Sequence, residues 1–188
     1  MSNIRLLCCL GAIMCLVLPS CASPRRASDI LHERPDDASL KQSNIVARVL
    51  IFVSNDCPIA NRYSPEIRKL HDAYAPRGIA FWLVHSDPEE TLDKVRQHDR
   101  EFNLNVPTVL DPDHSLVRLC KAEVVPSVAV FAADGRLVYR GRIDDRFAEL
   151  GRERPQPSRR DLQEALDAIL ANRPVTVSST KAVGCYIP

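Results

Sequence analysis

Residues 46–66 constrain the fold more than any other stretch, because an apolar strand there leads directly into a helix that a cysteine opens. Residues 46–53 are apolar except for Arg48 and rich in β-branched side chains, which predicts a buried strand. Pro58 follows Cys57 and suits the first position of a helix. Cys57 is then expected at a helix N-terminus, where unpaired N–H groups and the helix dipole favour thiolate over thiol. This placement indicates a nucleophile; the alternative is an inert cysteine buried at a strand end.

The segment after Cys57 predicts a parallel strand crossover. Residues 58–75 carry apolar side chains at helical spacing, and residues 79–85 form a second apolar run. A strand, a helix and a second strand imply a right-handed connection within one α/β domain. Asp87 and Pro88 then predict the start of a surface helix that ends near residue 102.

The second half of the chain predicts a hairpin and a last helix. Asp134-Gly135 between two strand-like runs is a hairpin signal. Pro126 stands just before the first of these runs, a position that favours a cis bond between Val125 and Pro126. Residues 143–157 read as a loop, and residues 158–170 as an amphipathic helix.

The N-terminus reads as an export signal. Residues 6–18 form an apolar run that is short for a membrane span and is followed by small residues. Leu18-Pro19-Ser20-Cys21 resembles a bacterial lipoprotein signal, so residues 1–21 are expected to be removed and Cys21 to carry lipid. Cleavage without lipidation and an uncleaved anchor are the alternatives. Residues 22–42 are polar and predict a tether, which places the protein in the periplasm or cell envelope, attached to the membrane by its lipid.

The charge and the cysteine content limit the classes of function that the chain can have. The formal net charge is +1 with no basic stripe, which argues against nucleic acid as a partner. Of seven cysteines, only Cys57, Cys120 and Cys185 belong to the folded domain. One pair could form a disulfide in an oxidising compartment and leave one thiol over. Cys120 reads as a small buried helix residue.

Metal binding is the weaker chemical option. The domain contains four histidines: His71, His85, His98 and His114. None of them has the sequence spacing from a cysteine that metal ligands show, so no metal and no cofactor are expected. Copper held by Cys57 with His114 is the alternative that remains.

These features together resemble the thioredoxin superfamily and, within it, the redoxin or peroxiredoxin-like (AhpC/TSA) branch. The resemblance covers residues 46–170 and rests on the strand ending at Cys57-Pro58, on Val125-Pro126 as the cis-proline loop, and on the Asp134-Gly135 hairpin. It implies a three-layer α/β sandwich, a central mixed sheet flanked by helices, over residues 43–172. Residues 173–188 form a tail that carries Cys185.

Two departures from this pattern guide the choice of site residues. Ala60 stands where a dithiol thioredoxin has its second cysteine, so a vicinal pair is absent. Ser54 matches the serine or threonine of the peroxidatic motif, but Leu50 replaces its proline. The resemblance also implies an arginine beside the thiolate, for which Arg140 and Arg142 are the candidates. Exposed arginines paired with nearby carboxylates are the alternative.

The sequence therefore predicts a thiol-dependent oxidoreductase. Cys57 would react with a small oxidant such as a peroxide, or with a protein disulfide, and an unidentified thiol would supply electrons. Cys185 would resolve the sulfenic acid on Cys57 by forming a disulfide. Two alternatives stay open: a non-catalytic binding or metal-carrier module on the same fold, and a purely structural disulfide between these cysteines.

Overall fold

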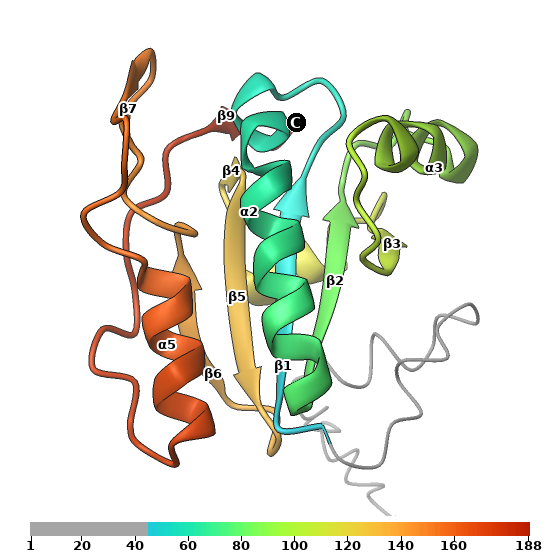
Figure 1. Cartoon of the computed structure of the whole chain (residues 1–188). Helices are drawn as coiled ribbons and strands as arrows, with labels where there is room; N and C mark the ends of the chain where they lie inside the picture. Colours follow the sequence, from blue (N-terminus) through green and yellow to red (C-terminus); the bar gives the residue numbers. More distant parts are fainter. Residues whose placement is uncertain (1–44) are drawn as a thin grey trace, which may run out of the picture.

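A five-stranded mixed sheet forms the centre of the molecule in the computed structural model, which describes residues 45–188 (Figure 1). The strand order is β3-β2-β1-β5-β6. The first three strands are parallel, β5 runs antiparallel to β1, and β6 runs antiparallel to β5. The strands are β1 (Ala47–Val53), β2 (Ile79–His85), β3 (Thr108–Leu110), β5 (Ser127–Ala132) and β6 (Leu137–Gly141).

Helices cover both faces of this sheet. Helix α2 (Pro58–Tyr74) and α5 (Asp161–Leu170) lie on one face, and the short α4 (Ser115–Cys120) lies behind it (Figure 1). Helix α3 (Leu92–Glu101) lies on the β3 side, and a single 3₁₀ turn, η2 (Ala75–Arg77), joins α2 to β2. The three-layer α/β sandwich that the sequence predicts is confirmed. No helix among residues 45–188 is long and apolar enough to cross a membrane.

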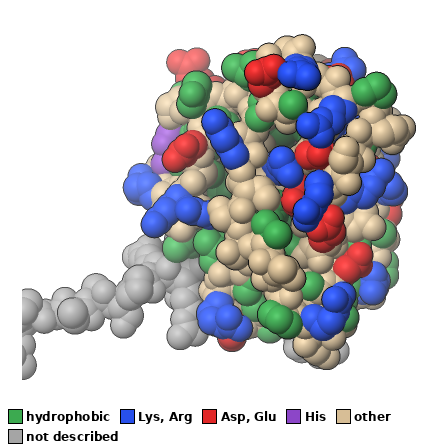
Figure 2. All heavy atoms as spheres, turned by 90° about the vertical axis from the view of Figure 1, so that its left-hand side faces the viewer, with side chains coloured by type: hydrophobic (Ala, Val, Ile, Leu, Met, Phe, Trp, Pro, Cys, Tyr) green, Lys and Arg blue, Asp and Glu red, His purple; other side chains and the backbone are tan. Residues whose placement is uncertain are grey.

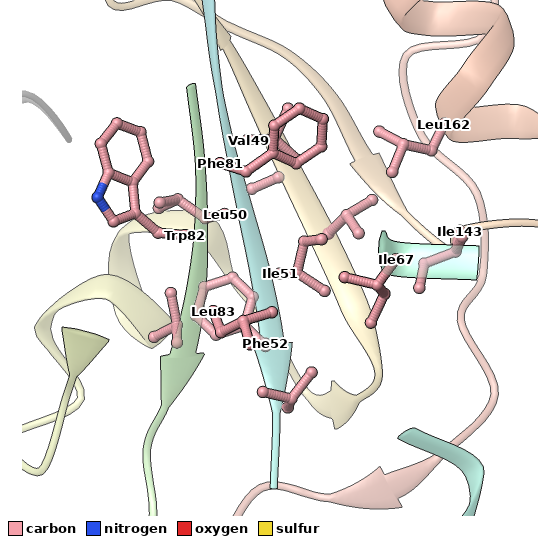
Figure 3. Packing of buried hydrophobic residues seen from close by; sticks show 14 of the residues in the cluster. Val49, Leu50, Ile51, Phe52, Ile67, Phe81, Trp82, Leu83, Ile143 and Leu162 are labelled. Carbon is pink, nitrogen blue, oxygen red and sulfur yellow. The ribbon is translucent and has the colours of Figure 1, made fainter. Parts of the chain in front are cut away.

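The core forms where β1 is buried on both faces. Val49 and Ile51 point toward α2 and α5, and the alternate residues Leu50 and Phe52 point to the opposite layer (Figure 3). All four are fully buried, as expected of a central strand covered on both sides. This packing fixes the end of β1, and so it also fixes where the chain enters the loop that leads to Cys57.

The structure corrects the start of α3. The helix begins at Leu92, and the Thr91 side chain accepts the Lys94 N–H at its N-terminus. The Asp87 side chain instead accepts the Glu89 N–H at 2.8 Å in a turn. A carboxylate that bonds to nearby backbone favours turns as much as helix starts, which is why the sequence signal was ambiguous.

Two further corrections concern residues 143–170. Helix α5 begins at Asp161 and not at Ser158, where the sequence predicts its start. The Ser158 N–H donates to the Asp145 carboxylate at 2.6 Å, and this bond holds Ser158 in the loop before the helix. The preceding segment, expected to be loop, contains a small two-stranded ribbon of β7 (Phe147–Glu149) and β8 (Arg152–Glu153).

The C-terminal tail (residues 173–188) is docked by backbone hydrogen bonds. Arg140 of β6 bonds to Ser178 and Thr180 of the tail, each at 3.0 Å. Further on, β9 (Cys185–Tyr186) pairs antiparallel with β4 (Val124–Val125). The tail thus runs along β6 and ends above the N-terminus of α2, where Cys57 lies (Figure 1).

The predictions for residues 1–21, for lipid on Cys21 and for the tether at residues 22–42 lie outside the described residues.

Candidate active site

Cys57 is the N-cap residue of α2, and Pro58 is its first helical residue. The Cys57 Sγ lies 3.5 Å from the Ala60 N–H, which donates to it, and 3.3 Å from the carbonyl oxygen of Val125. Only 2% of Cys57 is exposed. The helix N-terminus thus offers an N–H donor to a thiolate at this position, while the surrounding residues exclude water.

Cys185 lies directly beside Cys57. The two Sγ atoms are 2.7 Å apart although 128 residues separate them in the chain, and both are free thiols. A disulfide bond is about 2.05 Å long, so a small approach would join the sulfurs. Burial, the hydrogen bond with Cys57 and the charge of Cys57 raise the pKa of Cys185 to about 11.

Backbone pairing between β4 and β9 brings Cys185 close to Cys57. Val125 is the partner of Cys185 in the β4–β9 ladder, and the peptide bond between Val125 and Pro126 is cis, as the sequence predicts. Gly184 lies against this loop: a Cβ atom there would come within 2.0 Å of the Val125 carbonyl oxygen. The sequence analysis missed the role of Gly184, because no local pattern shows which backbone it meets.

A small cavity of about 110 Å³ opens on the two sulfurs. Ser54 borders it, and the Ser54 carbonyl accepts the Cys57 N–H at 3.3 Å. The residues that line the cavity besides the two cysteines are Ser54, Asp56, Ser86, Asp87, Val125, Tyr186, Ile187 and Pro188. Among residues 45–188, the charged side chains of this lining are two aspartates, and no arginine belongs to it.

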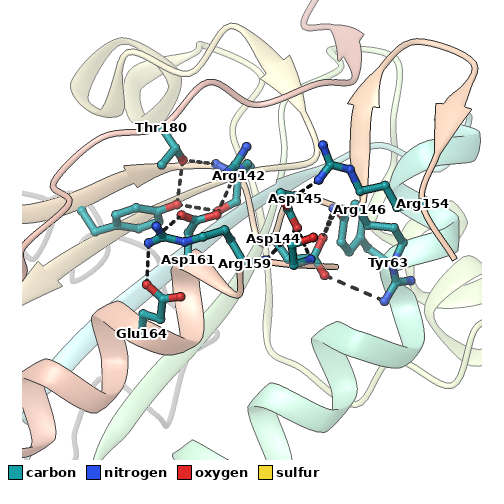
Figure 4. Close-up of polar contacts among 12 residues, drawn as sticks. Tyr63, Arg142, Asp144, Asp145, Arg146, Arg154, Arg159, Asp161, Glu164 and Thr180 are labelled. Atoms are coloured by element: carbon teal, nitrogen blue, oxygen red, sulfur yellow. Dashed lines mark hydrogen bonds and ion pairs between the residues drawn. The ribbon is translucent and has the colours of Figure 1, made fainter. Parts of the chain in front are cut away.

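The two candidate arginines are placed elsewhere. The Nε of the Arg142 side chain donates to the Asp161 carboxylate at 2.7 Å, and the backbone N–H of Arg142 donates to the Thr180 hydroxyl at 3.1 Å (Figure 4). Arg140 borders a different and larger cavity behind the tail. Among residues 45–188, no hydrogen bond or ion pair joins either guanidinium to Cys57.

A polar clamp, missed by the sequence analysis, holds the backbone of Asn55 two residues before Cys57. The Asn55 N–H donates to the Glu90 carboxylate at 3.0 Å, and the Asn55 carbonyl accepts from the Asn61 amide at 2.9 Å. His85 bonds the other Glu90 oxygen, and His98 bonds the Asn61 side chain, both at 2.9 Å. The loop that presents Cys57 is therefore fixed from both sides.

The histidines accordingly have structural partners. His114, the alternative copper ligand, places Nε2 2.7 Å from the carbonyl oxygen of Ser86. Residues 45–188 contain no group of three or more His, Cys, Asp or Glu side chains arranged to hold a metal ion.

Replacement of Glu90 by alanine is expected to lower the free energy of unfolding at pH 7 by about 1–3 kcal/mol, since it leaves the Asn55 N–H and His85 without their acceptor. Burial raises the pKa of Glu90, but the hydrogen bond and charge of His85 and the Asn55 N–H together hold it below its ordinary value of 4.5. A lowered pKa in the folded state stabilises the protein above the unfolded pKa, and this contribution disappears as the pH falls through the folded pKa.

Urea unfolding at pH 7 and below pH 4 measures both effects. The difference between wild type and Glu90→Ala should shrink on acidification, and the exposed Glu89→Ala should match wild type throughout. Equal stability of Glu90→Ala and wild type at pH 7 would show that the clamp contributes nothing.

Comparison with known proteins agrees with this geometry. Residues 30–140 match the AhpC/TSA family, a match that spans more than half of the chain. The chain belongs to the AhpC/TSA family. The matched AhpC/TSA region contains Cys57, Pro126 and Arg140 but ends before Cys185, so the family match itself does not include the tail.

Solved structures support the fold. An uncharacterised conserved protein from Geobacillus kaustophilus is 27% identical, with a TM-score of 0.65 and 76% of each chain covered. A hypothetical protein from Sinorhizobium meliloti 1021 is 28% identical, with a TM-score of 0.67, over 77% of this chain and 80% of that one. A thioredoxin-like protein in its oxidised form is 20% identical, with a TM-score of 0.52, over 69% of this chain and 80% of that chain. The search of curated proteins found no match.

The predicted membership of a thioredoxin-like redoxin family is thus confirmed, and so is the thioredoxin-like fold. The cysteine at the start of α2 and the cis-proline loop meet in one place, where the Cys57 thiol donates to the Val125 carbonyl oxygen. The tail adds a second cysteine to that place.

Proposed function

We propose that this protein is a thiol–disulfide oxidoreductase in which Cys57 and Cys185 are the redox pair. The observation that carries the proposal is the 2.7 Å separation of the two Sγ atoms beside the cis-proline loop. A pair held this close by backbone pairing can cycle between dithiol and disulfide without a large rearrangement. Cys185 thus takes the role of the second cysteine of a vicinal pair, a position that Ala60 occupies in this chain.

The accessible sulfur of the pair is Cys185. Cys57 is 2% exposed, whereas Cys185 is partly exposed on the tail. An incoming thiolate would therefore attack the Cys185 sulfur of the disulfide, form a mixed disulfide there, and release Cys57 as a thiolate. The N–H of Ala60 lies against that sulfur and favours it as the leaving group. In the reverse direction, Cys57 attacks a mixed disulfide on Cys185 and expels the partner thiolate.

Peroxide reduction is the second candidate, favoured by the 110 Å³ cavity that opens on Cys57 and is large enough for a small oxidant. The Cys57 thiolate would take one oxygen of the peroxide to give a sulfenic acid and an alcohol or water. Cys185 would then condense with the sulfenic acid, releasing water and forming the disulfide. The described residues that line this cavity carry no cation to support a peroxide, so thiol–disulfide exchange is the leading function.

We also propose a compartment for this chemistry, from the sequence of the N-terminus. An export signal at residues 1–21 and a lipid on Cys21 would place the redox pair in the cell envelope, with a tether at residues 22–42. Protein disulfides or protein thiols would be its substrates there, and an external thiol would reduce the pair.

Ellman's reagent, a small aromatic disulfide, tests the proposal on the reduced protein. Wild type should release two equivalents of the aromatic thiolate from the pair and keep no adduct, because Cys57 displaces the group from Cys185. Cys57→Ser should release one equivalent and keep a stable adduct on Cys185. Mass spectrometry of tryptic peptides locates the adduct or the disulfide.

Two outcomes would overturn the proposal. If neither cysteine reacts until the protein unfolds, the non-catalytic binding module becomes the better interpretation. If the disulfide forms but millimolar dithiothreitol cannot reduce it in the folded protein, the bond is structural rather than redox-active. Cys120→Ser is the matched control, since Cys120 is 2% exposed and outside the pair.

A further inference from the structure

A second cavity, of about 510 Å³, lies between the tail and the body of the protein. Its floor contains Phe52 and Val128 of the sheet, and its outer wall is the tail from Ser179 to Gly184. This volume is in the range of sites that hold small organic molecules. Gly184 borders this cavity, Cys185 borders the small cavity of the redox pair, and Tyr186 borders both, so the two cavities adjoin along β9.

The charge around this cavity is predominantly positive. Its cationic lining residues are Lys121, Arg140, Arg142 and Lys181, and its acidic ones are Glu123 and Glu149. Arg142 is bound to Asp161, and Glu149 to Arg152. Figure 2 views this side of the molecule, where Lys and Arg side chains are spread across the face.

Arg140 is the cation best placed to bind a ligand. Its backbone is bonded to the tail, and the residue is half-buried. Within residues 45–188, its guanidinium has no hydrogen bond or ion pair, unlike that of Arg142. A half-buried guanidinium without an acceptor is suited to bind a carboxylate through two parallel N–H bonds.

A buried hydroxyl gives independent support. Ser127 lines the same cavity and is 6% exposed, and its Oγ has no partner in the described part of the chain. Buried polar groups in proteins are nearly always hydrogen-bonded, so this hydroxyl in the cavity wall is available to bond a polar atom of a ligand. Beside it, Phe52, Val128 and Phe147 supply apolar surface.

We infer that this cavity binds a small organic acid, an aromatic or aliphatic carboxylate whose anionic group is held by Arg140 and whose apolar body packs toward Phe52. This site is separate from the redox pair and does not depend on the function proposed above. Because the tail forms its outer wall, a bound acid would also hold β9 in its docked position.

Fluorescence titration of the full chain with 1-anilinonaphthalene-8-sulfonate tests the inference, since this probe joins an aromatic body to an anionic group. One equivalent should bind, and the uncharged counterpart N-phenyl-1-naphthylamine should bind at least about tenfold more weakly. Octanoate or benzoate should displace the bound probe.

Arg140→Gln should weaken binding of the anionic probe by about tenfold or more. Arg136→Gln is the matched control: it removes an arginine from the same hairpin that is exposed, paired with Asp134 and outside the cavity. If Arg140→Gln fails to fold, Lys121→Gln at the exposed rim should weaken binding instead. Equal affinity of wild type and the folded variants, or equal affinity for the charged and uncharged probes, would overturn the inference.

Discussion

Cys57→Ser is expected to reduce thiol-dependent turnover by at least about a thousandfold, because the substitution removes the sulfur that both proposed reactions need. In disulfide exchange, Cys57 expels the partner from Cys185; in peroxide reduction, it is the atom that is oxidised. Turnover is measured with dithiothreitol as reductant and either hydroxyethyl disulfide or hydrogen peroxide as oxidant, after subtraction of the rate without protein. The ratio of the two rates also tells which oxidant the site prefers.

Cys185→Ser separates the roles of the two cysteines. This variant should react once with hydrogen peroxide and stop at a sulfenic acid on Cys57, which dimedone labels, because the thiol that contacts Cys57 within residues 45–188 has been removed. Cys120→Ser should keep full activity, since burial and the charge of Asp111 raise the pKa of Cys120 to about 12 and leave it unreactive. Full turnover by Cys57→Ser would refute the assignment of the nucleophile.

The sequence predicts the parts of this fold that local interactions determine. Strand β1 is apolar apart from Arg48 because both of its faces are covered, and the Asp134-Gly135 turn forms from its own residues. The helix starts at residues 87 and 158 were wrong for a physical reason. Their side-chain and backbone groups form hydrogen bonds in turns and loops, and only tertiary packing decides between these and a cap.

The site could be predicted only in part. Cys57 is recognisable from its position between a strand and a helix, but its distance from Cys185 depends on the pairing of two short strands, β4 and β9. No periodicity fixes such a register in strands of two residues. Likewise, Arg142 meets Asp161 and Asn55 meets Glu90 through contacts that join separate elements. Sequence patterns identify which residues are chemically capable, and the fold decides which of them meet.

Gly184→Ala is expected to slow disulfide formation between Cys57 and Cys185 by about a hundredfold, the cost of displacing a reacting atom by roughly 1 Å. A Cβ on residue 184 would lie 2.0 Å from the Val125 carbonyl oxygen and 2.6 Å from its carbon. Both are backbone atoms of a buried residue next to the cis-proline bond, so the tail rather than the loop must move. Cys185 is the next residue and would move with it.

The same displacement should expose Cys57, and this second effect distinguishes a lifted tail from general unfolding. Iodoacetamide should alkylate Cys57 faster in Gly184→Ala than in wild type, while the buried Cys120 stays unmodified in both. Tyr186→Ala is the matched control on the other side of Cys185, because Tyr186 is 82% exposed and its backbone pairing with Val124 does not need the side chain. Stopped-flow measurement of disulfide formation after one equivalent of oxidant gives the rate. A Gly184→Ala protein that closes the disulfide as fast as wild type would mean that the β4–β9 pairing does not position Cys185. In that case the tail would act as a flexible carrier of its thiol, and its docked position would not set the rate of disulfide formation.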